Sequence, residues 1–106
     1  MTHLCLDRAF VALADSGRRA MVDRLSSGPA TGKVLAEAAG LRLPSAVKHL
    51  KVLQEGGILA STKTGRSRTY RLETRALQAI GDWARSREAS WNTAFDRLTM
   101  AMREND

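Results

Sequence analysis

The 106-residue sequence has little of the material that several classes of protein require. Its single cysteine, Cys5, excludes an internal disulfide and is typical of a chain kept in a reducing compartment. It has no run of 18 apolar residues, which excludes a transmembrane helix. The first ten residues also lack the basic segment and long apolar run of a signal peptide. We therefore expect a cytoplasmic, single-domain protein over residues 1–106 with no membrane partner.

Acidic residues are scarce in one third of the chain. Between residues 41 and 75 there are eight basic residues but only two acids, Glu55 and Glu73, and this segment accounts for the whole formal charge of +6. The nine basic and nine acidic residues elsewhere cancel. Such clustering is typical of a surface that binds phosphates, and a merely solvated surface is the alternative.

Hydrophobic periodicity predicts a mainly α-helical chain. Apolar residues at helical spacing indicate a first helix over about residues 6–14. Asp15 or Ser16 can cap a second helix over about residues 17–25, because either side chain accepts hydrogen bonds from free backbone amides. The Ser-Ser-Gly-Pro segment that follows ends this helix.

Two further short helices are joined by a tight turn. Thr31 is expected to cap a helix that ends near Ala39, and Gly40 can take the left-handed conformation that stops it. Pro44 suits the first position of the next helix, which should end near Glu55. The residues of the second, third and fourth helices predicted to face inward are Met21, Val22, Leu25, Leu35, Ala36, Ala39, Ala46, Leu50 and Leu53. This order predicts a helix-turn-helix over about residues 31–56.

The pattern then changes to two short segments, residues 58–63 and 67–73, around Thr64-Gly65-Arg66. Their alternation predicts a β-hairpin with Tyr70 and Leu72 on one face of its second strand. Thr74 can cap a last helix over residues 75–102, about 42 Å long. Ser86 and Ser90 are candidate positions for a break in it. The predicted fold is a winged helix-turn-helix, α-α-α-α-β-β-α, with the wing over about residues 58–73.

The last predicted helix has a longer apolar stripe than so small a domain can cover. An apolar surface that outruns its own core favours a partner helix, so we expect a homodimer. The candidate interface residues on this helix are Leu77, Ile80, Trp83, Trp91, Phe95 and Leu98. Stacking on a ligand is the alternative for its aromatic residues.

The second helix of the helix-turn-helix fits the major groove of duplex DNA, with the side chains near its N-terminus closest to the base edges. Lysines there can contact guanine acceptors or phosphates, and the basic hairpin tip can contact the backbone or enter the minor groove. The candidate DNA-binding residues are Ser45, Lys48, His49, Lys51, Lys63, Arg66 and Arg68. For His49, a core or capping role is the alternative.

The stretch LPSAVKHLKVLQEGGI, followed by KTGRSRTYRL, resembles the ArsR/SmtB family of winged-helix repressors. The segment FVALADSGRRAMVDRLSSGPATGKVLAEAAG is similar to that family's opening helices, so the resemblance covers about residues 6–98. It implies an operator-binding dimer joined through its first and last helices, which adds Leu6 and Phe10 to the interface. It also implies that Val47 lies near DNA where many members have serine. Valine cannot donate a hydrogen bond, but it can contact a thymine methyl group.

The metal sites familiar in this family lack their residues here. The chain has no Cys-x-Cys pair, and its last helix has no histidine. We therefore expect no metal and no cofactor, as in the branch of the family without a metal site, and the sequence identifies no small-molecule effector. His3 and Cys5 would supply two ligands where structural zinc takes four, and a frayed or packed terminus is the alternative. A redox role for Cys5 is a further alternative.

The resulting hypothesis is a sequence-specific transcriptional regulator, expected to be a repressor, that binds an inverted-repeat DNA operator as a homodimer. An enzyme is not expected. The segment from Gly28 to Lys33 has one residue too few between its glycines for a phosphate-binding loop, and no catalytic arrangement is recognisable. A protein-interaction module is the alternative, because winged-helix domains also serve as docking scaffolds.

Overall fold

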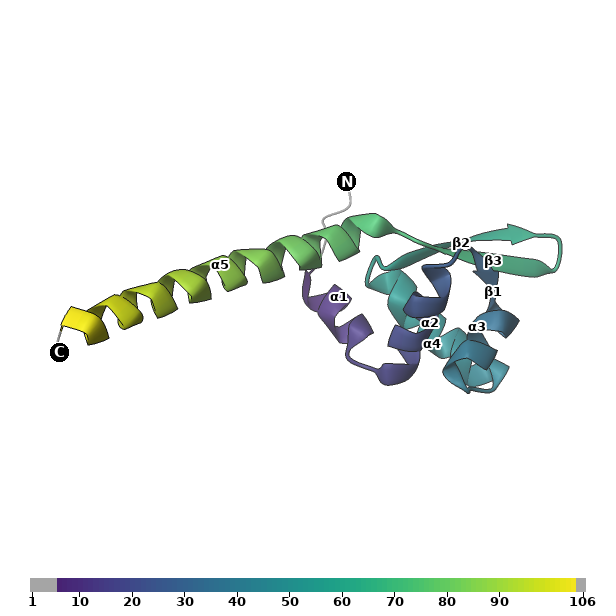
Figure 1. Ribbon diagram of the computed structural model, residues 1–106. Helices are drawn as coiled ribbons and strands as arrows, with labels where there is room; N and C mark the ends of the chain where they lie inside the picture. The colour runs from purple at the N-terminus through teal and green to yellow at the C-terminus, as the bar shows by residue number, and fades with distance from the viewer. Residues whose placement is uncertain (1–5, 105–106) are drawn as a thin grey trace.

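The computed structural model describes residues 6–104 and has the predicted winged helix-turn-helix order (Figure 1). One short strand is added to the predicted elements. The helices and strands are α1 (Leu6–Leu13), α2 (Ser16–Leu25), β1 (Ala30–Thr31), α3 (Gly32–Ala39), α4 (Leu43–Glu55), β2 (Leu59–Thr64), β3 (Ser67–Leu72) and α5 (Thr74–Glu104). Helices α3 and α4 form the helix-turn-helix, and β2 and β3 form the wing.

The helix boundaries follow the local signals in the sequence. The Asp15 carboxylate accepts a hydrogen bond from the amide three residues on, at 3.0 Å, and so caps α2. Thr31 caps α3 in the same way. Gly40 ends α3 with a left-handed φ of 66°, and Pro44 lies in the first turn of α4. These four predictions are confirmed.

The core lies where α2, α3 and α4 meet the inner face of the sheet. Its largest fully buried side chains are Met21, Leu35, Leu50, Leu53, Ile58 and Leu59. The residues predicted to face inward from α2, α3 and α4 are all buried or half-buried. Helix α1 turns small residues, Ala9 and Ala12, toward the core. Gly56 lets α1 approach the end of α4, since a Cβ there would lie 2.9 Å from both the Ala12 Cβ and the Arg8 carbonyl oxygen.

The additional strand, β1, connects the wing to the helix-turn-helix. Ala30 lies opposite Tyr70 and Thr31 opposite Thr69, so β3 is the middle strand of a three-stranded antiparallel sheet, β1-β3-β2. The same Thr31 caps α3, so the strand and the first helix of the helix-turn-helix share a residue. A two-residue strand has too few positions to show an alternating pattern, which is why the sequence did not reveal it.

Helix α5 is continuous over 31 residues, about 46 Å. Neither candidate position for a break, Ser86 or Ser90, interrupts it: the Ser90 hydroxyl bonds back to the Ser86 carbonyl oxygen within the unbroken helix. Only the first turns of α5 touch the domain, where Ala76 is buried. The rest projects as an arm, with its end and the wing tip at opposite ends of a molecule 71 Å long (Figure 1). Between Leu6 and Glu104, no helix is long and apolar enough to cross a membrane.

Candidate nucleic-acid interface

Helix α4 has three faces with different surroundings. Its inner face is the buried stripe of Ala46, Leu50 and Leu53. Helical periodicity places Lys48 and Lys51 on the opposite side, where both are exposed. One flank faces the wing and the other faces α1 and α2, as the contacts described below show. Both lysines of α4 therefore lie on its outward face, where they are exposed to solvent.

The N-terminal half of α4 is accessible at every position predicted to meet DNA except His49. Ser45 is exposed, and Val47 is 49% exposed on the flank nearer the wing. Arg42, immediately before the helix, is also exposed and makes no capping hydrogen bond through its side chain. Arg42 was not among the predicted site residues, although its basic charge next to the start of α4 was a usable signal.

The wing presents three exposed cations near its tip. Gly65, with φ of 62°, forms the turn beside Arg66. Lys63 lies directly opposite Arg68 on the neighbouring strand, on the same face of the hairpin. Like charges in directly opposed positions destabilise a hairpin, so an anion between them would relieve their repulsion. This geometry favours a phosphate contact.

A chain of side-chain hydrogen bonds connects the wing to α4. The Arg68 guanidinium donates to the Ser61 hydroxyl at 2.8 Å, and this hydroxyl donates to the Gln54 side-chain oxygen of α4 at 3.5 Å. The cationic face of the wing therefore lies on the Gln54 flank of α4. Sequence analysis missed Ser61 and Gln54, because their role depends on a contact between the wing and α4 that hydrophobic periodicity does not reveal.

Arg71 lies on the opposite face of the wing. Its guanidinium donates to the Thr62 hydroxyl at 3.0 Å and lies 3.8 Å from the Glu73 carboxylate. Adjacent residues of a strand point to opposite faces, so Arg71 does not share the face of Arg68 and Lys63. It is a basic residue of the same segment that lies outside the candidate interface.

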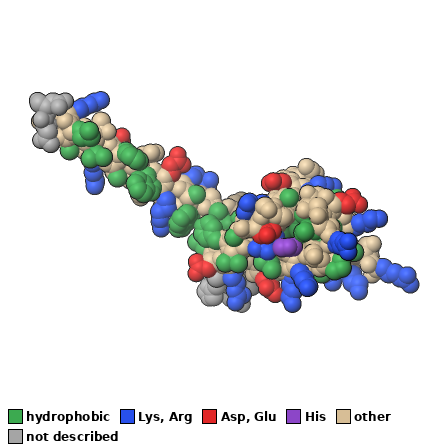
Figure 2. Space-filling view, turned by 90° about the horizontal axis from the view of Figure 1, so that it is seen from below, with side chains coloured by type: hydrophobic (Ala, Val, Ile, Leu, Met, Phe, Trp, Pro, Cys, Tyr) green, Lys and Arg blue, Asp and Glu red, His purple; other side chains and the backbone are tan. Residues whose placement is uncertain are grey.

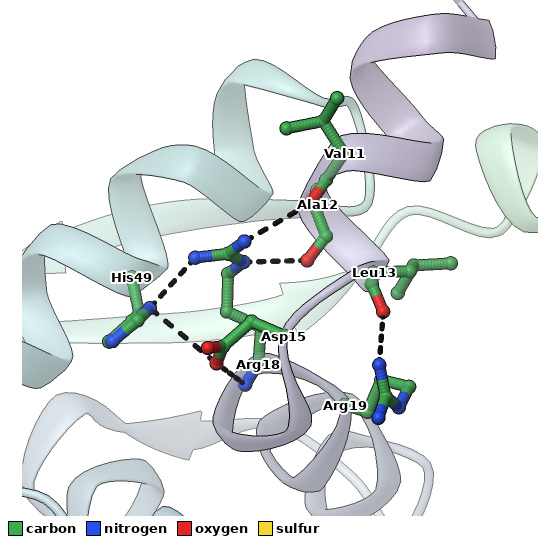
Figure 3. A network of polar contacts seen from close by, with 7 residues as sticks. All are labelled: Val11, Ala12, Leu13, Asp15, Arg18, Arg19 and His49. Atoms are coloured by element: carbon green, nitrogen blue, oxygen red, sulfur yellow. Dashed lines mark hydrogen bonds and ion pairs between the residues drawn. The ribbon is translucent and has the colours of Figure 1, made fainter.

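His49 lies on the flank of α4 that faces α1 and α2, and its side chain is 26% exposed (Figure 3). Its Nδ1 atom is 2.9 Å from an Arg18 guanidinium nitrogen and 3.8 Å from the Asp15 carboxylate. The Arg18 guanidinium also donates to the carbonyl oxygens of Ala12, at 2.7 Å, and Val11, at 3.1 Å. The Nδ1 atom of His49 is therefore engaged within the protein, which is in keeping with the alternative of a core or capping role. Its contact with DNA stays a prediction.

The Asp15 carboxyl is the acidic member of this cluster. The hydrogen bond from the Arg18 amide holds the pKa of Asp15 below its ordinary value, since it stabilises the ionised form. Partial desolvation opposes this, and the Arg18 guanidinium, together with His49 when its ring is protonated, lowers the pKa further. The sequence analysis predicted that Asp15 caps the second helix, but it did not place Asp15 or Arg18 near the candidate site.

The predicted dimer residues fall into two groups. Leu6 is half-buried, and Leu77 and Ile80 pack partly against their own core. Phe10 of α1 and Trp83 of α5 pack edge-to-face with ring centroids 5.3 Å apart. Farther along α5, Trp91, Phe95 and Leu98 are 64%, 58% and 56% exposed. Figure 2 shows hydrophobic side chains along this arm.

The residues described, 6–104, include no group of three or more histidine, cysteine or acidic side chains placed to hold a metal ion. The N-terminal pair considered above, His3 and Cys5, lies outside the described residues.

A helix-turn-helix with a basic outer face, joined to a cationic β-hairpin, defines a winged helix-turn-helix DNA-binding domain. Comparison with known proteins agrees, since residues 13–62 match the family described as a helix-turn-helix domain. The chain is 38% identical to the HTH-type transcriptional regulator Rv2034 of Mycobacterium tuberculosis over 79 residues, 74% of each chain. It is 30% identical to the transcriptional repressor SdpR of Bacillus subtilis, over 74% of this chain and 87% of that one.

Solved structures agree with these relatives. The crystal structure of an ArsR family transcriptional regulator, 39% identical, covers 82% of this chain and 90% of its own with a TM-score of 0.76. The homodimeric winged helix-turn-helix DNA-binding domain of Mb0332 from Mycobacterium bovis, 29% identical, covers 72% of this chain and 77% of its own with a TM-score of 0.61. The chain belongs to the ArsR family of transcriptional regulators. It is thus a transcriptional regulator with a helix-turn-helix DNA-binding domain.

Proposed function

We propose that this regulator represses transcription by binding an inverted-repeat DNA operator as a homodimer. The observation that carries the proposal is the pairing of two surfaces. The outward face of α4 and the linked face of the wing are cationic, whereas the projecting part of α5 carries an exposed apolar stripe. The first surface suits a polyanion, and the second suits another copy of the chain.

In this proposal α4 enters the major groove and the wing lies along the flanking backbone. Ser45, Val47, Lys48 and Lys51 face the bases or phosphates, with His49 at the edge of the contact. Lys63, Arg66 and Arg68 of the wing meet the backbone or the minor groove. Within residues 6–104 no acidic side chain forms an ion pair with any of these lysines and arginines, which leaves their charges available for phosphates.

Dimerisation is proposed through the apolar stripe of α5 together with α1. Trp91, Phe95 and Leu98 recur at helical spacing on the side of α5 that carries Ile80 and Trp83 near the domain. Contact with a second α5 would remove this surface from water, and the relative Mb0332 is itself homodimeric. A two-fold axis predicts operator half-sites one helical turn apart, roughly 34 Å.

Repression is the mode of regulation that we propose, and the relative SdpR is a transcriptional repressor. We include no metal ion, because the cysteine pair and the histidines of the family's familiar sites are absent from the sequence. No cofactor and no small-molecule effector form part of the proposal.

The proposal is tested with duplexes selected from random DNA by the purified protein. Binding should be sequence-specific and should weaken steeply with salt, because cations on the protein displace counterions from DNA. The variant Lys48→Ala, Lys51→Ala, Arg66→Ala should bind at least about 100-fold more weakly with a shallower salt dependence, since each lost phosphate contact removes about one unit of slope. Its dimeric state, measured by light scattering, should be unchanged.

Arg71→Ala is the matched control, because it removes a cation of the same segment from the opposite face of the wing. It should change the affinity less than about threefold, as expected for an exposed ion pair. Equal and weak binding of the native protein to every duplex would refute sequence-specific repression.

A further inference from the structure

The contact between Arg18 and His49 fixes the position of a proton. A guanidinium group has only donors, so at 2.9 Å from Arg18 the His49 Nδ1 atom must be the acceptor. In a neutral imidazole the hydrogen then lies on Nε2. We infer that Arg18 is a positioning residue that locks His49 in the Nε2–H tautomer, so that His49 offers duplex DNA a hydrogen-bond donor and never an acceptor. The DNA half of this inference rests on the proposed function.

Arg18 is held firmly enough to impose this choice. Its Nε and a second guanidinium nitrogen donate to the carbonyl oxygens of Ala12 and Val11, close to the C-terminal end of α1. This end of a helix attracts a cation, because its free carbonyl groups carry partial negative charge. These two carbonyl oxygens fix the planar group, and its third nitrogen, Nη1, points at His49 (Figure 3).

The other tautomer has a poorer environment. A hydrogen on Nδ1 would face the Arg18 donor at 2.9 Å. The Asp15 carboxylate, the nearby acceptor, lies 3.8 Å from Nδ1, which is too far for a hydrogen bond. Asp15 is also engaged by the Arg18 amide. The arrangement of both residues thus favours an unprotonated Nδ1.

The second ring nitrogen of His49 is directed away from Arg18 and Asp15 (Figure 3). With a hydrogen there, the ring can bond to guanine O6 or N7, adenine N7, thymine O4 or a phosphate oxygen. It cannot accept from the amino groups of cytosine or adenine. A histidine side chain can donate or accept a hydrogen bond, and the Arg18 contact selects donation at Nε2.

The tautomer can be measured on the DNA-free protein by long-range ¹H–¹⁵N correlation NMR, with His3→Gln to assign the two histidines. We expect neutral His49 to be protonated on Nε2 alone. Arg18→Met, which keeps an aliphatic stem and removes every donor, should produce a mixture of tautomers. Arg18→Lys, which keeps a donor, should retain more of the Nε2–H form. A native ring protonated on Nδ1, or the same tautomer in Arg18→Met, would overturn the inference whether or not the protein binds DNA.

The DNA half is tested with two amides of different reach. A glutamine amide extends to about the position of Nε2, whereas an asparagine amide extends only to that of Nδ1. On the selected operator, His49→Gln should bind within about threefold of the native protein, and His49→Asn and His49→Ala should lose about tenfold. All three variants must show native circular dichroism.

Modified operators identify the acceptor. A base that lacks its N7, O6 or O4 acceptor, or a single neutral methylphosphonate, should weaken the native protein at one position and have no additional effect on His49→Ala. A response to a modified base assigns a base contact, and a response to the methylphosphonate assigns a phosphate contact. If the glutamine variant is as weak as alanine, or if no substitution in the operator couples to His49, donation from His49 to DNA is refuted. A native protein that binds no duplex refutes the proposed function as well, while the tautomer measurement still decides the role of Arg18.

Discussion

The domain of this molecule buries most of its apolar residues, whereas the arm exposes them. In the domain, the largest apolar side chains of α2, α3 and α4, such as Met21, Leu35 and Leu50, are fully buried and the cations lie outside. Along α5 beyond Asp82 every side chain described is exposed, including both tryptophans. The domain thus buries its apolar side chains in its own core, whereas, among the residues described, nothing in the single chain packs against the apolar stripe of the arm. This difference supports our proposal that the two surfaces bind different partners, a polyanion at the cationic face and a second copy of α5 at the apolar stripe.

The largest expected effect comes from the core of the domain. Leu50→Ala should lower the free energy of unfolding by about 2–5 kcal/mol, because it removes a fully buried side chain of α4 and leaves a cavity. Urea denaturation followed by circular dichroism measures the loss. The exposed leucine of the arm supplies the contrast: Leu98→Ala should reduce stability at concentrations where the native protein is dimeric, and the loss should vanish at concentrations so low that both proteins are monomeric. Equal losses at all concentrations would contradict the division between domain and arm.

The next effect concerns the arm itself. The double variant Trp91→Asp, Phe95→Asp should raise the dissociation constant of the dimer at least about 100-fold, since two charges would enter a desolvated interface. Sedimentation at several concentrations gives this constant. Met100→Asp is the control, because Met100 is equally exposed but lies on the other side of α5. It should leave the dimer intact, and dissociation in both variants would show that the stripe is not the interface.

The same contrast explains how much the sequence could predict. Caps and breakers act locally, so Asp15, Thr31, Gly40 and Pro44 could be assigned before any contact was known. The inward faces of α2 to α4 also followed from periodicity. The continuity of α5 did not follow from periodicity. Ser86 and Ser90 were candidate positions for a break, but the Ser90 hydroxyl bonds to the Ser86 carbonyl oxygen within the helix.

The contacts that shape the candidate site were harder to foresee. Arg18 meets His49 across 31 positions of the chain, and Ser61 meets Gln54 only after the wing folds onto α4. A pattern shows that a residue is polar and on which face it lies, but not which distant side chain it meets. His49 was therefore assigned to DNA from its lysine neighbours, while one of its ring nitrogens bonds to α2.

A smaller effect is expected from the link between wing and helix. Ser61→Ala removes the hydroxyl that bridges Arg68 and Gln54, so it should free the Arg68 side chain with little effect on the core. Operator affinity should fall about threefold to tenfold, the value of one or two exposed hydrogen bonds. Fluorescence anisotropy measures it, with Thr64→Ala as a control near the tip that has no bond to Arg68 among the side-chain contacts described. Equal losses in the two variants would indicate that the bridge does not position the wing.

The smallest effect tests the junction between α1, α2 and α4 through pH. The pKa of Asp15 is lowered in the folded protein, chiefly by the Arg18 amide, so the unfolded chain takes up the proton first as the pH falls. The stability that Asp15 supplies is therefore complete above its unfolded pKa of about 3.9 and is lost as the pH falls toward the lower folded pKa. Asp15→Asn keeps an oxygen that can cap α2 but has no proton to gain. Its unfolding midpoint in urea should fall less steeply than that of the native protein below about pH 4. Parallel curves would mean that the carboxylate charge adds nothing to the capping oxygen, and that Arg18 alone joins α2 to His49.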